Sequence, residues 1–262
     1  MTIRLLHLTD IHFGCQNLEA VAAAQDFAEA SRFDAVVVTG DVTQSGRRRE
    51  FQAAADWLAA LPGPRICTPG NHDTPYFGML DRLFQPFARY RAFLGPSTSH
   101  GLVIDGLNIQ AINTARGAQV RLNWSKGAIR AADALRSCEA LGPAGDALRV
   151  IACHHPLMEV TGGPMTGRVR GGRRASEILA QGGVDLILTG HVHMPFAHAL
   201  PFGDHRTYAA GASTLSLRER GTPAGFNVIE ADEATIRISA LGWTGSGFAP
   251  QRSWGFDRRG AG

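Results

Sequence analysis

Short, continuously apolar runs recur along the chain, and longer segments with helical periodicity separate them. The runs AVVV at residues 35–38 and VIAC at 150–153 show no polar alternation. Such runs are typical of strands in a parallel sheet, which is covered on both faces. Two parallel strands need a long crossover between them, and this crossover is usually a helix. The pattern therefore predicts an α/β fold organised on parallel strands.

The beginning and the end of the chain differ in pattern. Strands and helices alternate at first, whereas the segments after Met194 have strand character without intervening helices. Two facing sheets with helices outside fit this order better than one open, doubly wound sheet. We therefore expect one α/β domain over residues 1–250, with two facing mixed sheets. A Gly- and Arg-rich stretch at 251–262 is expected to be a flexible tail.

Composition narrows the classes of function. The 262 residues are 44% apolar and 19% charged, so the chain can bury a full core, and the net charge of +3 is milder than most nucleic-acid binders show. None of the four cysteines forms a C-x-x-C pair, which favours a reduced, cytoplasmic protein. No apolar run approaches the ~20 residues that a membrane span needs. Nucleic acid is therefore not favoured as a partner, and no membrane span is expected.

Five polar stretches stand where predicted strands end. In α/β sheets the loops at the carboxyl ends of strands converge on one crevice, where ligands bind. Six of the ten histidines fall within these stretches. A random distribution of histidines along the chain would not concentrate them in this way. The stretches are TDIHFG (Asp10, His12), TGDVTQSG (Asp41), PGNHD (Asn71, His72, Asp73), CHHP (His154, His155) and TGHVHMP (His191, His193).

The spacing and the residue types indicate a metal centre. Asp10 with His12, and His191 with His193, are i, i+2 pairs, and in an extended chain such pairs point to the same face. Oxygen and imidazole ligands without cysteine favour manganese, iron or zinc over a thiolate site. About seven ligands are too many for one tetrahedral ion, whereas two ions bridged by a shared carboxylate would use them all. Asp41 is the natural bridge, because it stands alone on its loop.

The order D-x-H, G-D, G-N-H-D, H and G-H-x-H resembles the calcineurin-like metallophosphoesterases, most closely their class III cyclic-nucleotide phosphodiesterase branch. The resemblance covers residues 5 to about 215. It implies a four-layer α/β/β/α sandwich that binds two metal ions (Mn²⁺, Fe²⁺/Fe³⁺ or Zn²⁺). One ion would be held by Asp10, His12, Asp41 and His193, and the other by Asp41, Asn71, His154 and His191. His154 is chosen over His155 on the family pattern, in which the ligand precedes the proline by two residues.

The resemblance also implies roles for the two residues after Asn71. His72 would sit near the leaving group and, if protonated, donate a proton to the leaving oxygen or stabilise it. Asp73 is a candidate to accept a hydrogen bond from the His72 ring, as carboxylates often do for working histidines. The alternative for Asp73 is a helix N-cap.

The expected function is hydrolysis of small phosphodiesters, cyclic nucleotides among them, by a hydroxide held between two metals. Within the same fold the alternatives are a pyrophosphatase acting on a UDP-linked lipid, a nuclease and a phosphomonoesterase. A metal-binding scaffold without catalysis is a further alternative, although every motif position is filled. A lipid substrate would favour an apolar cap, for which 77–94 is the candidate window. Two points are left open: whether the protein forms a homodimer, and whether the Arg-rich loop 161–174 is a basic lid or a solvated loop with helix-starting residues.

Overall fold

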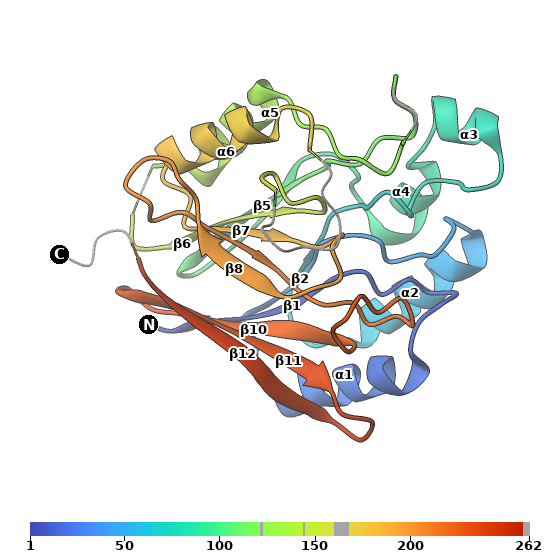
Figure 1. Ribbon diagram of the computed structural model, residues 1–262, viewed down its shortest axis with the longest axis horizontal. Helices are drawn as coiled ribbons and strands as arrows, with labels where there is room; N and C mark the ends of the chain where they lie inside the picture. Colours follow the sequence, from blue (N-terminus) through green and yellow to red (C-terminus); the bar gives the residue numbers. More distant parts are fainter. Residues whose placement is uncertain (121–122, 144, 160–167, 259–262) are drawn as a thin grey trace.

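Two six-stranded mixed sheets face each other, and helices cover their outer sides (Figure 1). The computed structural model describes residues 1–120, 123–143, 145–159 and 168–258. In spatial order the first sheet contains β12 (Phe248–Asp257), β11 (Thr235–Trp243), β10 (Gly225–Ala231), β1 (Ile3–Leu8), β2 (Ala35–Val38) and β3 (Arg65–Cys67). The second contains β4 (His100–Ile104), β5 (Leu107–Ile112), β6 (Leu148–Cys153), β7 (Leu186–Thr189), β9 (Tyr208–Gly211) and β8 (Phe196–Ala199).

The helices lie outside the two sheets, which confirms the predicted four-layer α/β/β/α arrangement. Apolar residues of α1 and α2 join one core with the first sheet, and those of α5 and α6 join another with the second sheet. Pro86 separates α3 from α4, as its missing N–H and fixed ring predict. The helices are α1 (Leu18–Ala30), α2 (Arg48–Ala60), α3 (Met79–Phe84), α4 (Ala88–Leu94), α5 (Ala131–Leu141) and α6 (Gly172–Gln181).

Each buried strand serves two cores at once. Leu6 and Leu8 of β1 pack in the core shared with the helices, whereas Leu5 packs between the sheets. The side-chain period of two explains this division. It also explains why the strand sequences read as continuous apolar runs. The strands are consequently fixed in register, and the loops at their ends are held in defined places.

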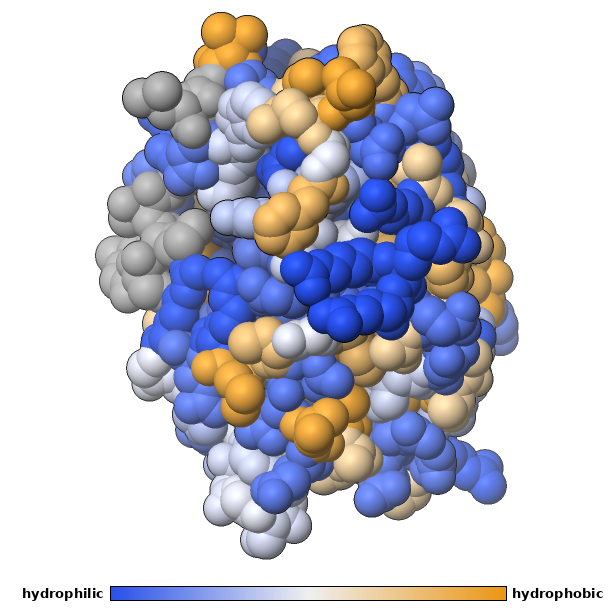
Figure 2. All heavy atoms as spheres, turned by 90° about the vertical axis from the view of Figure 1, so that its right-hand side faces the viewer, coloured by the Kyte–Doolittle hydropathy of each residue, from blue (hydrophilic) through white to orange (hydrophobic). Residues whose placement is uncertain are grey.

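Parallel pairing brings the polar stretches together. β1, β2 and β3 run parallel, and so do β5, β6, β7 and β9. Their carboxyl ends therefore lie along shared edges of the two sheets. The side of the molecule that carries α3 and α4 shows a band of strongly hydrophilic side chains across its middle, with apolar groups above and below it (Figure 2).

The prediction of a flexible tail over residues 251–262 is wrong for most of that range, since β12 extends to Asp257 and pairs with β11. Trp254 and Phe256 alternate along β12 and pack against the core between the sheets. This period-two alternation was the strand signal, and the high Gly and Arg content concealed it. Residues 259–262 lie outside the described part of the chain.

Candidate metal centre

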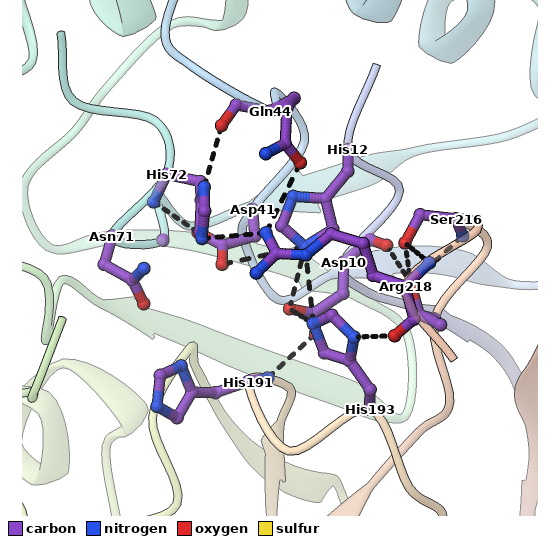
Figure 3. A network of polar contacts seen from close by, with 12 residues as sticks. Asp10, His12, Asp41, Gln44, Asn71, His72, His191, His193, Ser216 and Arg218 are labelled. Carbon is purple, nitrogen blue, oxygen red and sulfur yellow. Dashed lines mark hydrogen bonds and ion pairs between the residues drawn. The ribbon is translucent and has the colours of Figure 1, made fainter. Parts of the chain in front are cut away.

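The structure brings all seven predicted metal ligands into one polar cluster between the sheets (Figure 3). The first sheet supplies Asp10 after β1, Asp41 after β2 and Asn71 after β3, and the second supplies histidines after β6 and β7. Among the described residues, four groups have potential ligand atoms that lie within 4.8 Å of one another: Asp10, His12 and His193; Asp10, Asp41 and His154; His12, Asp41 and His72; His154, His155 and His191.

The two predicted ion positions share one acidic residue, Asp41, and each position places a histidine close to a carboxylate. His193 Nε2 lies 3.0 Å from Asp10 Oδ1, and His154 Nε2 lies 3.2 Å from Asp41 Oδ2. Asp41 Oδ2 is also 4.0 Å from His12 Nε2. Asp41 therefore stands between histidines assigned to different ions, which is the place that a bridging carboxylate requires.

Buried polar atoms without hydrogen bonds test whether a metal fits. Asp10 Oδ1, His12 Nδ1, Asn71 Oδ1 and His154 Nε2 lack a hydrogen-bond partner among the described residues, although their surroundings are buried. An unsatisfied buried polar atom costs about 1–3 kcal/mol, so a native structure rarely gathers four of them without a purpose. All four belong to predicted ligands, although in His12 the nitrogen that faces the cluster is Nε2, 3.7 Å from Asp10 Oδ1, and not the unsatisfied Nδ1. The donor set fits two ions that accept oxygen and imidazole nitrogen.

The backbone at the ligands is not extended, which corrects one part of the sequence interpretation. Among the described residues, six non-glycine residues have a positive φ, and five of them, with φ between 50° and 69°, are predicted ligands. The left-handed region costs roughly 1–3 kcal/mol per residue and is often found at functional sites. The pairs D-x-H and H-x-H still converge, but through left-handed turns. The five are Asp10, His12, Asp41, His191 and His193.

Glycines before the ligands allow the loops around the cluster to approach one another closely. A Cβ on Gly70 would collide with Oδ1 of Asp41, and a Cβ on Gly190 would collide with the hydroxyl of Thr9. Neither clash involves a flexible chain end that could move away. The glycines in PGN and TGH are therefore explained by close packing around Asp10 and Asp41.

The electrostatics of the cluster follow from burial and charge pairing. Burial alone would raise the pKa of Asp10 and of Asp41, but neighbouring histidines hold both well below their usual range. Burial lowers the pKa of His154, but Asp41 overcomes this effect and raises it to about 9. Burial lowers the pKa of His12 and of His191 to about 3. His12 and His191 are thus neutral, as metal ligands must be, and metal binding would displace a proton from His154.

His155 differs from His154 in how its ring nitrogens are used. Its Nδ1 lies 2.8 Å from Thr114 Oγ1, and its Nε2 lies 2.8 Å from the Ser125 carbonyl. In His154, Nδ1 contacts the Thr39 carbonyl at 2.7 Å and Nε2 faces Asp41. His155 shares the cluster with His154 and His191, but only His154 has a nitrogen left for a metal.

This difference gives a matched pair of substitutions. His154→Ala should lower the metal content, because it removes an unsatisfied nitrogen from the cluster. His155→Ala should leave the metal content unchanged and lower the free energy of unfolding by roughly 1–3 kcal/mol, because buried partners lose their hydrogen bonds. Metal analysis and denaturant unfolding of both variants provide the measurement, and loss of metal from His155→Ala alone would reverse the assignment.

Asp73 has neither of the two roles considered from the sequence. Its carboxylate accepts bonds from the backbone N–H groups of Gly70 (2.9 Å), Thr43 (2.9 Å) and Val42 (3.3 Å), and from the Thr43 hydroxyl (2.8 Å). It is not the partner of the His72 ring, and α3 begins only at Met79. Burial and nearby Asp41 raise the pKa of Asp73 to about 7. Asp73 therefore ties the loop after β2 to the loop after β3.

Asp73→Ala should lower the free energy of unfolding by about 3 kcal/mol or more, because several buried donors would lose their acceptor, at about 1–3 kcal/mol each. Asp232→Ala is the matched control: Asp232 accepts bonds from two backbone N–H groups at 2.9 and 2.7 Å, but it is exposed. Its loss should have a clearly smaller effect in the same urea titration. Equal effects of the two substitutions would contradict the tying role.

The His72 ring contacts two residues that the sequence did not single out. Its Nδ1 lies 2.7 Å from the Gln44 carbonyl, and its Nε2 lies 2.9 Å from Nη1 of Arg218 (Figure 3). A guanidinium group only donates hydrogen bonds, so Nε2 accepts and Nδ1–H donates to Gln44. Proton donation from Nε2 to a leaving group, expected from the resemblance, is not compatible with this arrangement.

Threonines at the strand ends are a second feature that sequence reasoning missed. Thr9 Oγ1 donates to Asp10 Oδ2 at 2.7 Å, and Thr39 Oγ1 contacts the buried ring of His7 at 2.9 Å. Thr189 bonds to a carbonyl of the neighbouring strand β9, and Thr68 bonds to a carbonyl of β5 in the facing sheet. The recurring Thr just before the ligand motifs was visible in LTD, VTGD, CTPG and LTGH. Arg218 had no such signal.

The Arg-rich loop 161–174 is described only from Arg168 onward; residues 160–167 lie outside the described part of the chain. Arg173 and Arg174 stand in the first turn of α6, and Arg174 pairs with Glu177 at 2.8 Å. The helix-starting role expected for this end of the loop is therefore observed, and the role as a basic lid remains a prediction.

The model of the calcineurin-like phosphoesterase family matches residues 3–195, and the chain belongs to that family. The chain is 27% identical over 257 residues to the 3',5'-cyclic adenosine monophosphate phosphodiesterase CpdA of Escherichia coli, a match that covers 92% of this chain and 86% of CpdA. It is 39% identical over 80 residues to the glycerophosphodiester phosphodiesterase GpdQ of Enterobacter lignolyticus, but this match spans only 26% of the chain and 29% of GpdQ.

A solved structure of PhoD shares the fold, with a TM-score of 0.72 and 11% identity over 98% of this chain and 70% of that one. The family and the fold class predicted from the motifs are thus confirmed. Among the described residues, no helix combines the length and the apolar character needed to cross a membrane.

Proposed function

We propose that the protein is a metal-dependent phosphodiesterase that uses two ions and acts on small diesters, with cyclic nucleotides among its substrates. The observation that carries this proposal is the placement of Asp41 between two groups of buried, unsatisfied ligand atoms. When bound, two such ions would generate a nucleophile from water near neutral pH and polarise the phosphoryl group. Oxygen and imidazole donors favour Mn²⁺, Fe²⁺/Fe³⁺ or Zn²⁺. The names of the relatives support a diester substrate.

The residues of the chain provide orientation around this centre. Asp10 Oδ2 accepts the backbone N–H of His191 at 2.8 Å, and the Arg218 carbonyl lies 2.8 Å from His193 Nδ1. The first bond fixes the backbone of His191, and the second fixes the His193 ring so that its Nε2 faces Asp10, as partners of metal-binding histidines usually do. Substrate would therefore meet a centre whose ligands need little rearrangement.

The test is a substrate screen of the Mn²⁺-loaded protein, with metal content measured on the same sample. We expect about two ions per chain, because seven ligands with a shared carboxylate suit a pair of ions. We expect faster hydrolysis of bis-p-nitrophenyl phosphate and cAMP than of the monoester p-nitrophenyl phosphate. One ion per chain would refute the two-metal assignment, and a preference for the monoester would refute the diesterase assignment.

The α3 region favours one second candidate, a pyrophosphatase acting on a UDP-linked lipid. Six large apolar side chains there are 46–79% exposed, and the segment follows the PGNHD loop directly. Arg47 lies over the Phe77 ring at 5.1 Å, so a cation borders this surface. A UDP-lipid analogue in the same screen tests this candidate. The six are Tyr76, Phe77, Met79, Leu80, Leu83 and Phe84.

A further inference from the structure

The side chain of Arg218 extends from the loop after β9 into the middle of the polar network (Figure 3). Nη1 lies 2.9 Å from His72 Nε2 and 3.3 Å from Gln44 Oε1. His72 in turn lies edge-on to His12, with 4.8 Å between the ring centroids. The guanidinium group therefore contacts a histidine whose ring packs against a predicted metal ligand.

The backbone of Arg218 is fixed independently of its side chain. Its N–H donates to Ser216 Oγ at 3.2 Å, and its carbonyl lies 2.8 Å from His193 Nδ1. The Ser216 hydroxyl contacts Thr214 Oγ1 at 2.7 Å, and this residue bonds to the carbonyl of Asp10. The loop thus belongs to the framework of the metal centre, and the side chain projects from a rigid base.

The guanidinium group has more donors than acceptors. An arginine carries five N–H donors, and the two side-chain acceptors that the Arg218 guanidinium contacts in the described part of the chain both face Nη1. Among the described residues, no carboxylate forms an ion pair with it. A half-buried cation with spare donors and no partner carboxylate is suited to an anionic ligand, and arginine binds phosphoryl oxygens well because its donors form a planar fork.

We propose that Arg218 binds a phosphoryl oxygen of the substrate, and that His72 acts as a positioning residue that holds the guanidinium group in place. This inference rests on the proposed function, because it assumes a phosphodiester at the metal centre. Nδ1–H of His72 is anchored on the Gln44 carbonyl, so Nε2 presents a fixed acceptor to Arg218. The side-chain oxygen of Gln44, Oε1, provides the second acceptor for Arg218. Arg218 would then stabilise negative charge on the phosphoryl group during the reaction.

The experiment compares Arg218→Ala, Arg218→Lys and His72→Ala in the Mn²⁺-loaded protein. We expect Arg218→Ala to lower kcat/KM by roughly 10²–10³-fold, the usual effect of losing one oxyanion donor. The affinity for inorganic phosphate, measured by calorimetry, should fall at least about tenfold. Metal content should not change, because the contact with His193 is made by the backbone. Guanidinium ion added to Arg218→Ala should restore part of the activity, and Arg218→Lys should retain part of it.

Arg237→Ala is the control, because Arg237 is exposed on β11 and pairs with Glu230 of β10 near the start of β1, away from the ligand end of that strand. It should change neither kcat/KM nor phosphate affinity. The double variant Arg218→Ala/His72→Ala should be no worse than Arg218→Ala, since His72 acts through Arg218.

Normal phosphate affinity in Arg218→Ala, or loss of metal from it, would overturn the inference. Additive losses in the double variant would overturn the positioning role of His72. An inactive wild-type protein would refute the proposed function instead, and the phosphate titration would still test Arg218.

Discussion

Asp41→Asn is expected to remove most of the bound metal and most of the activity. The substitution takes away the negative charge between the two predicted ion positions, yet an asparagine oxygen can still accept the His72 N–H that Asp41 Oδ1 accepts at 2.7 Å. The fold should therefore survive. Activity should fall by more than the roughly 10–100-fold that loss of an outer partner costs, because a shared ligand is lost. Metal analysis and diester hydrolysis measure both effects.

Asp34→Asn is the control for this experiment, since Asp34 accepts the backbone N–H of Arg4 at 2.7 Å and lies at the opposite end of β1. It should leave both metal content and turnover near those of the wild type. Near-normal turnover in Asp41→Asn, with two ions still bound, would show that Asp41 is not the bridge.

Substitutions of the neighbouring residues Asn71 and His72 should distinguish metal binding from phosphate chemistry. Asn71→Ala removes a buried, unsatisfied oxygen from the cluster, so one ion should bind more weakly and excess Mn²⁺ should restore part of the activity. His72→Ala should leave the metal content unchanged and lower kcat by roughly 10²-fold or more. The two variants therefore differ in metal dependence, which a Mn²⁺ titration of activity records.

The leaving group distinguishes two roles for His72. In the structure His72 Nε2 accepts a bond from Arg218, so we expect the loss in His72→Ala to be similar for p-nitrophenolate and for a ribose alkoxide. A loss concentrated on the ribose alkoxide would show that His72 donates a proton after all, as the family resemblance first implied. Loss of metal from His72→Ala would make it a ligand.

The position of the site could be predicted from the sequence because it depends on strand order and motif chemistry. Parallel strands place their carboxyl ends together, so DIH, GD, GNHD, CHHP and GHVH had to meet if the runs before them were strands. The ligand roles themselves remain predictions. The geometry could not be predicted, because an i, i+2 spacing looks the same whether Asp10 and His12 are extended or left-handed.

The sequence did not predict contacts between residues that are distant in the chain. Asp73 bonds to Val42 and Thr43, which come from another loop, and a local pattern offered only its neighbour His72 or a helix start. Arg218 reaches His72 across 146 positions of sequence. Nothing in LRERG distinguishes this arginine from a solvated one. Side-chain contacts between loops depend on the fold as a whole, and spacing rules do not capture them.

The position of β1 in the interior of the first sheet affects how the chain can fold. β1 pairs with β2 on one side and with β10 on the other, where Ile3 lies opposite Ala231. Contacts between such distant residues slow folding, because a large loop must close before they form. A growing chain that contains only the first three strands has Asp10, Asp41 and Asn71 but lacks the histidines that follow β6 and β7. Tight metal capture is therefore tied to completion of the fold, and a nascent chain would offer ions only scattered, weak ligands.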